Sequence, residues 1–179
     1  MAALITKRLA IHSLFAAFLL VSAGCASKNV TISDTFPTGG YASPWILDSP
    51  VWCGEPDEAS FAVGDEYPEW KAFNPKRLWL AVYRHDSRRD NTITVRAWSF
   101  PNSEQARRAY EKFRPENASA LKAGDEACWT KDGILVLWGR MIFDIFDTNA
   151  SGASSPEQAV YLLAFFEKKM PHDLPYNPQ

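Results

Sequence analysis

Hydrophobic and polar positions alternate in two stretches near the middle of the chain, Leu78–Arg84 and Thr92–Trp98. In the second stretch the odd-numbered residues 93 to 97 are apolar, whereas Thr94 and Arg96 face the other way. A period of two indicates a strand with one face against a core. The polar loop His85–Asn91 separates the two stretches, so the pattern predicts an antiparallel hairpin.

Three shorter apolar stretches follow, at Ala127–Thr130, Ile134–Trp138 and Met141–Phe146. The segments between them contain glycine and are only two or three residues long, which is typical of tight hairpin connections. These three stretches therefore predict an antiparallel meander.

Two helices are expected. Between Asn102 and Arg114, apolar residues recur at helical spacing, and Pro115 ends the helix. Pro156–Met170 is the second helix, and its centre is apolar nearly all round, which indicates deep burial. The elements together predict an α+β domain: an antiparallel sheet of about five strands with two helices packed on one face.

The flanking segments predict four regions. Residues 1–24 form a signal peptide, 25–50 a flexible tether rich in Ser, Thr, Gly and Pro, 51–171 a single domain, and 172–179 a C-terminal tail. The end of the tether, 45–47, is too apolar for a pure linker, so we expect the fold to begin there. Within 51–75, prolines interrupt any period and permit at most a short helix near Asp57–Phe61.

The chain begins with a basic pair, Lys7 and Arg8, followed by a short apolar stretch and small residues. The run Val21-Ser22-Ala23-Gly24-Cys25 resembles the lipobox of bacterial lipoproteins. It departs from the commonest pattern at Ser22, where leucine is preferred. The mature domain is only loosely similar to uncharacterised extracytoplasmic lipoprotein domains.

The resemblance implies that signal peptidase II cleaves before Cys25 and that this residue carries acyl chains, including palmitate, that anchor the protein. Ala26 follows instead of Asp, and this implies the outer membrane, with the domain facing the periplasm. The alternatives are an ordinary cleaved signal with an incidental Cys25, or an uncleaved anchor.

Composition narrows the function classes. Of 179 residues, 46% are hydrophobic and 22% are charged, which is typical of a folded domain. Without residues 1–24 the chain has 17 basic against 21 acidic residues, a formal charge of −4. An acidic chain binds the phosphate groups of nucleic acids poorly, so we expect no nucleic-acid partner.

The cysteine count is three. If Cys25 is lipidated, Cys53 and Cys128 remain, and in an oxidising compartment we expect them to form a disulfide. Closing a loop of that length would stabilise the fold by about 4 to 5 kcal/mol in the chain-entropy model. The alternative is a reactive or metal-binding thiol, although neither cysteine has a histidine nearby in sequence.

No catalytic, cofactor or metal motif is present, so we expect no cofactor and no metal. His85, beside Asp86 at the mouth of the loop, is the candidate for a catalytic acid or base. Its neighbour Asp86 would point to the opposite face of a strand and could not orient it. A patch of Arg84, Arg88 and Arg89 with the helix arginines would form only if the loop and the first helix were neighbours.

Seven tryptophans are the unusual compositional feature. Four of them lie on expected strands and are assigned to the core, whereas Trp45, Trp52 and Trp70 lie in irregular segments. Because aromatic side chains on loops often bind ligands, these three are the candidate ligand surface. The alternative is that they close one side of the sheet.

The sequence thus predicts a membrane-anchored extracytoplasmic lipoprotein that binds an envelope protein or a cell-wall ligand and catalyses no reaction. The alternative function is a small extracytoplasmic hydrolase that uses His85.

Overall fold

The computed structural model describes residues 35–38, 42–58, 60–148 and 156–169. All of them belong to one compact unit, Thr31–Gln179. The expected signal peptide, Cys25 and the expected tail 172–179 lie outside the described residues. The elements in chain order are β1 Trp45–Leu47, β2 Trp52–Gly54, η1 Pro56–Glu58, α3 Ser60–Val63, η2 Gly64–Glu66, α4 Tyr67–Lys71, β3 Arg77–His85, β4 Thr92–Ser99, α5 Ser103–Phe113, β5 Ala120–Leu121, β6 Glu126–Trp129, β7 Gly133–Trp138, β8 Met141–Asp147 and α6 Pro156–Lys169.

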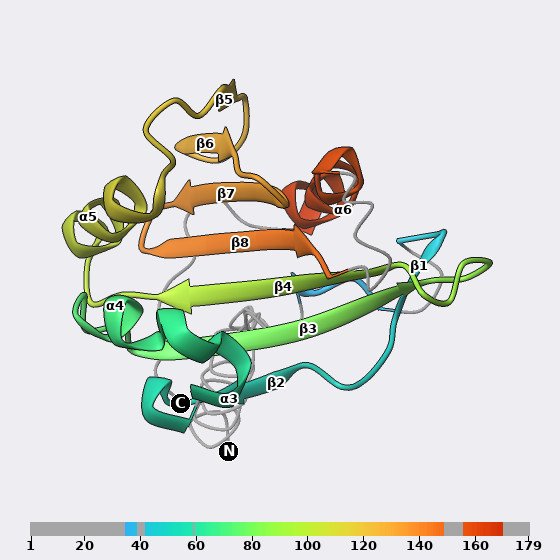
Figure 1. Cartoon of the computed structure of the whole chain (residues 1–179), viewed down its shortest axis with the longest axis horizontal. Coiled ribbons are helices and arrows are strands. Elements are labelled where there is room, and N and C mark those ends of the chain that lie inside the picture. The colour runs from blue at the N-terminus through green and yellow to red at the C-terminus, as the bar shows by residue number, and fades with distance from the viewer. Residues whose placement is uncertain (1–34, 39–41, 59, 149–155, 170–179) are drawn as a thin grey trace, which may run out of the picture. The chain divides into compact units, whose positions relative to one another are not determined.

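The described residues form one antiparallel sheet of eight strands in the order β1-β3-β4-β8-β7-β6-β5, and β2 pairs with β3 beyond one end of β1 (Figure 1). The α+β class, the central hairpin and the meander are therefore confirmed, but the expected count of five strands was too low. The three additional strands, β1, β2 and β5, have two or three residues each. Alternation cannot be read over so short a length.

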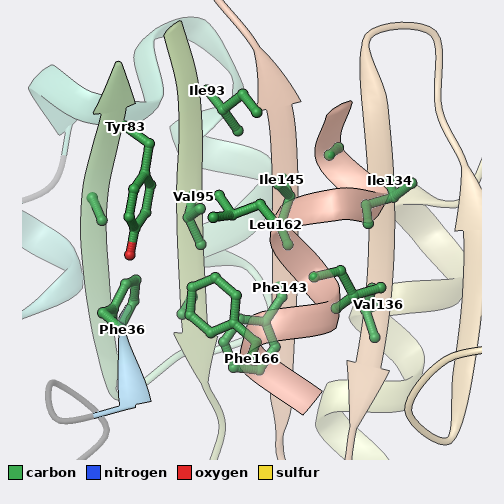
Figure 2. Packing of buried hydrophobic residues seen from close by; sticks show 14 of the residues in the cluster. Phe36, Tyr83, Ile93, Val95, Ile134, Val136, Phe143, Ile145, Leu162 and Phe166 are labelled. Atoms are coloured by element: carbon green, nitrogen blue, oxygen red, sulfur yellow. The ribbon is translucent and has the colours of Figure 1, made fainter. Parts of the chain in front are cut away.

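One face of the sheet packs on α6. Leu162 and Phe166 lie against Val95, Phe143 and Ile145, as Figure 2 shows. All of these side chains are buried, but Tyr161 on the outer side of α6 is 47% exposed, so the helix buries one face and not its whole apolar centre as its sequence predicts. We call this surface the α6 face.

The opposite face carries α5 and α4. Ala106, Ala109 and Tyr110 of α5 and Trp70 of α4 are buried in one cluster with the strand residue Trp98. The expectation that both helices share one face is therefore wrong. The reason lies in β7, where Ile134 and Val136 face α6 while Leu135 and Leu137 face α5. A strand that is apolar on both sides needs cover on both.

Part of the expected tether belongs to the domain. Phe36 is buried and meets the ring of Phe166 edge-on at 5.2 Å between centroids. The hydroxyl of Tyr83 donates a hydrogen bond of 3.1 Å to the carbonyl of Pro37. Strand β1 then pairs with the end of β3. Frequent Gly and Pro hid this packing, because they disrupt the periodicity without preventing single side chains from entering the core.

Candidate functional site

The face of the sheet that carries α4 and α5, which we call the α5 face, is fully packed in only one half. Under α4 and α5, the row formed by Leu78, Trp98 and Ile142 is buried. Along the same strands, Leu80, Val82 and Phe146 are only half-buried. In Figure 1, α3 and α4 lie in front of one end of β3 and β4. We define the open half-face by its residues, Leu80, Val82, Thr94, Arg96, Asp144 and Phe146.

A charged pair lies at the centre of this half-face. Arg96 on β4 and Asp144 on β8 are direct cross-strand partners. The Nε of Arg96 donates to Oδ2 of Asp144 at 2.9 Å, and Nη2 donates to the same oxygen. The two side chains are only 10% and 11% exposed. The pair is therefore almost removed from water in the middle of the sheet.

Two further groups hold the guanidinium of Arg96. Glu66, at the end of η2, accepts a hydrogen bond of 3.2 Å from Nη2 and is itself 60% exposed. The ring of Phe146 lies under the guanidinium, with 4.6 Å between Cζ and the ring centroid. Within the part of the chain that the structure describes, no hydrogen bond uses Nη1. The Nη1 group of Arg96 is therefore available to donate a hydrogen bond to another molecule.

The electrostatics of the pair are dominated by desolvation. Burial raises the pKa of Asp144 above its ordinary value, while the positive charge and hydrogen bonds of Arg96 oppose the rise. A buried ion pair adds little net stability, because the loss of hydration offsets the attraction between the charges. A perturbed, nearly buried charge on a half-covered face is therefore a candidate for ligand binding.

Sequence reasoning did not identify this site. The signals were Arg96 within an alternating strand and Asp144 as the single acid in the apolar run 141–146. Taken alone, each of these residues indicates only a solvent-exposed position on a strand. Only the pairing of β4 with β8, which are far apart in sequence, places the two charges opposite each other.

Two aromatic side chains lie beside the open half-face. Trp52 on β2 is the cross-strand partner of Leu80 and is half-buried. Phe61 on α3 meets its ring edge-on, with 5.3 Å between centroids, and is 69% exposed. This exposed phenylalanine extends the apolar surface at one margin of the site.

The expected ligand surface of three tryptophans does not exist. Trp45 is buried in the α6 face and Trp70 in the α5 face, where it stacks on Trp98 and Phe113. Only Trp52 is partly exposed. The segments that were expected to be irregular form β1 and α4 and pack on the sheet, so their large apolar side chains become core rather than surface.

The expected disulfide is also wrong, because Cys53 and Cys128 are both free thiols. Strands β2 and β6 are separated by β3, β4, β8 and β7, which places them roughly 24 Å apart at about 4.8 Å per strand. Moreover, Cys53 pairs with Trp79 on the α6 face, whereas Cys128 pairs with Leu135 on the α5 face. The number of cysteines gives no information about the order of the strands or about the face of the sheet on which each cysteine lies.

His85 lies half-buried at the end of β3, with its ring edge-on to Trp45 at 5.2 Å. Its Nδ1 lies 3.3 Å from both the backbone nitrogen and the hydroxyl oxygen of Ser87. Since the contact with Ser87 is made within a tight turn, it holds the ring in the loop. No carboxylate contacts the imidazole among the described residues.

The arginines of the β3–β4 loop and those of α5 do not form one patch. The loop joins β3 and β4 at one end of the sheet, and α5 follows the other end of β4 (Figure 1). Eight strand residues separate the two ends by roughly 26 Å. Arg84, Arg107 and Arg108 are each paired instead, with Asp48, Glu126 and Glu104 respectively.

The described residues contain neither a candidate metal site nor a candidate membrane span. No group of three or more His, Cys, Asp or Glu side chains is arranged there to hold a metal ion. Among the helices in the described ranges, none is both long enough and apolar enough to cross a membrane. Compared with known proteins, the chain matches no family model, no curated protein and no solved structure, so the open half-face is identified by its geometry alone.

Proposed function

We propose that the protein is an extracytoplasmic lipoprotein, anchored through Cys25 in the outer membrane, whose domain binds a ligand on the open half-face without catalysis. The observation that supports ligand binding is the nearly buried pair of Arg96 and Asp144 among half-buried apolar side chains. A few polar groups that converge among apolar side chains are a chemical feature of small-molecule sites.

Stability alone gives a poor account of the pair. Two apolar residues of similar size at these cross-strand positions would avoid the cost of desolvating two charges. The neighbouring row shows the apolar solution, with Trp98 opposite Ile142. A binding role explains why the next cross-strand pair on the same face, Arg96 and Asp144, is charged.

The anchor is supported by the basic start, the short apolar stretch and the run that ends at Cys25. Growth with an alkynyl analogue of palmitate tests it. We expect label on the wild-type protein and none on Cys25→Ser, while the control variant Cys53→Ser keeps the label. Label that persists on Cys25→Ser would contradict the proposed anchor.

Ligand binding can be tested on the mature chain, residues 25–179 with Cys25→Ser, which contains the whole compact unit. Octanoate, octylammonium and octanol serve as probes that share one tail and differ in their polar group. In ¹⁵N-resolved NMR titrations, at least one probe should shift resonances of the open half-face, including the Nε–H of Arg96, and not those of α6.

The matched control is the double variant Arg96→Met with Asp144→Leu, which removes the charges and keeps the approximate volume. It should fold and lose the polar-group preference. If no probe gives a saturable shift at the half-face, the proposed binding function is wrong. Ester hydrolysis that is lost in His85→Ala and kept in the double variant would favour the alternative, a hydrolase that uses His85.

A further inference from the structure

We infer that the ligand of the open half-face is an aliphatic carboxylate, such as a free fatty acid, whose carboxylate replaces Glu66 on Arg96. This inference rests on the proposed function and adds the chemical class of the ligand. Three features carry it: the donor groups of Arg96, the exposure of Glu66, and the apolar residues around the guanidinium.

The guanidinium of Arg96 is only partly used. Its Nε and Nη2 donate to Asp144, Nη2 also donates to Glu66, and Nη1 has no hydrogen-bond partner among the described residues. Arginine presents its donors as a planar fork that matches the two oxygens of a carboxylate. The edge with Nη1 and Nη2 is therefore available to a second carboxylate, once Glu66 leaves Nη2.

Glu66 is the weaker of the two acids that hold Arg96. Its single bond to Nη2 is 3.2 Å long, its side chain is 60% exposed, and it ends the three-residue helix η2. Exposed ion pairs are weak, because water competes for both charges. Asp144, by contrast, is buried and accepts hydrogen bonds from two nitrogens of Arg96. A ligand carboxylate would displace Glu66 and leave Asp144 in place.

The surroundings fit an alkyl chain rather than a second polar group. Phe146 lies under the guanidinium, and Leu80 and Val82 are half-buried on β3, beside β4. An alkyl chain that extends from Arg96 across these residues would bury apolar surface on both sides. Arg96 keeps two carboxylate partners, since the carboxylate of the ligand takes the place of Glu66 on Nη2. An ammonium group in the same position would face the positive charge of Arg96.

The three eight-carbon probes separate these possibilities on the mature chain with Cys25→Ser. Octanoate should bind roughly tenfold more tightly than octylammonium or octanol, as expected for a charge-assisted hydrogen bond. Its titration should shift the Nε–H resonance of Arg96. The variant Glu66→Gln removes the competing carboxylate, and it should raise the affinity for octanoate roughly two- to fivefold.

The control variant is Glu104→Gln, which removes an exposed acid that pairs with Arg108 on α5. It should leave all three affinities unchanged. Tighter binding of octylammonium or octanol than of octanoate, or weaker octanoate binding by Glu66→Gln, would overturn the carboxylate class and leave the binding site standing. Absence of binding by all three probes would instead contradict the proposed function itself.

Discussion

The two faces of the sheet differ in how completely they are packed and in whether they carry charged side chains. On the α6 face, the described strand residues under the helix are apolar and buried, from Val95 to Phe143 and Ile145. On the α5 face, the packed half ends after the row of Trp98 and Ile142, and the next cross-strand position holds Arg96 and Asp144. Covering a face completely requires apolar residues throughout, whereas a half-covered face can hold a charged pair beside its packed half.

The largest difference should appear between two phenylalanines of the same strand. Phe143 points into the α6 face and is buried, whereas Phe146 lies half-buried on the open half-face. We expect Phe143→Ala to lower the free energy of unfolding by about 3 to 5 kcal/mol, because it leaves a cavity in a packed core. Phe146→Ala should cost clearly less. Urea denaturation followed by circular dichroism measures both, and equal losses would remove the distinction between the faces.

The next effect concerns the charged pair. Asp144→Ala leaves the nearly buried Arg96 without its main partner, and it should lower the free energy of unfolding by about 3 kcal/mol or more. The double variant Arg96→Met with Asp144→Leu should recover most or all of this loss, because it removes both desolvation costs. A double variant as unstable as Asp144→Ala would mean that the pair is needed for folding.

A smaller effect separates the two cysteines. Cys53 is exposed on β2, whereas Cys128 is buried on β6, where burial raises the pKa of its thiol and leaves less thiolate at neutral pH. In the native mature chain with Cys25→Ser, iodoacetamide should therefore modify Cys53 and leave Cys128 until the protein is unfolded in urea. Mass spectrometry identifies the modified peptides. Rapid modification of Cys128, or a bridged peptide, would contradict the described packing.

The smallest effect is the pH dependence of the pair. Because burial raises the pKa of Asp144 in the folded state above its ordinary value of 3.8, the folded chain binds this proton more tightly than the unfolded chain. Its contribution is therefore most favourable at or below about pH 3.8 and declines as the pH rises through the folded-state pKa. Wild type should lose stability relative to Asp144→Asn over this range. The opposite slope would show that attraction by Arg96 outweighs desolvation.

Local pattern was sufficient for the main elements. The alternation of Thr92–Trp98 became β4, and the helical spacing that starts after Asn102 became α5. The side chain of Asn102 accepts a hydrogen bond of 2.8 Å from the backbone nitrogen of Gln105, as expected of a residue that caps a helix. These features depend on interactions between residues a few positions apart, so the sequence alone determined them.

Tertiary structure decided the rest. Strand order separates Cys53 from Cys128, a second apolar side of β7 sends α5 and α6 to opposite faces, and long-range packing buries Trp45 and Trp70. The candidate site is the clearest case, since Arg96 and Asp144 are 48 residues apart in the sequence. Each charge is ordinary in its own strand. The two charges form a pair only because the cross-strand register places them opposite each other. This register is set by the apolar residues on both sides of the sheet, and no local pattern encodes it.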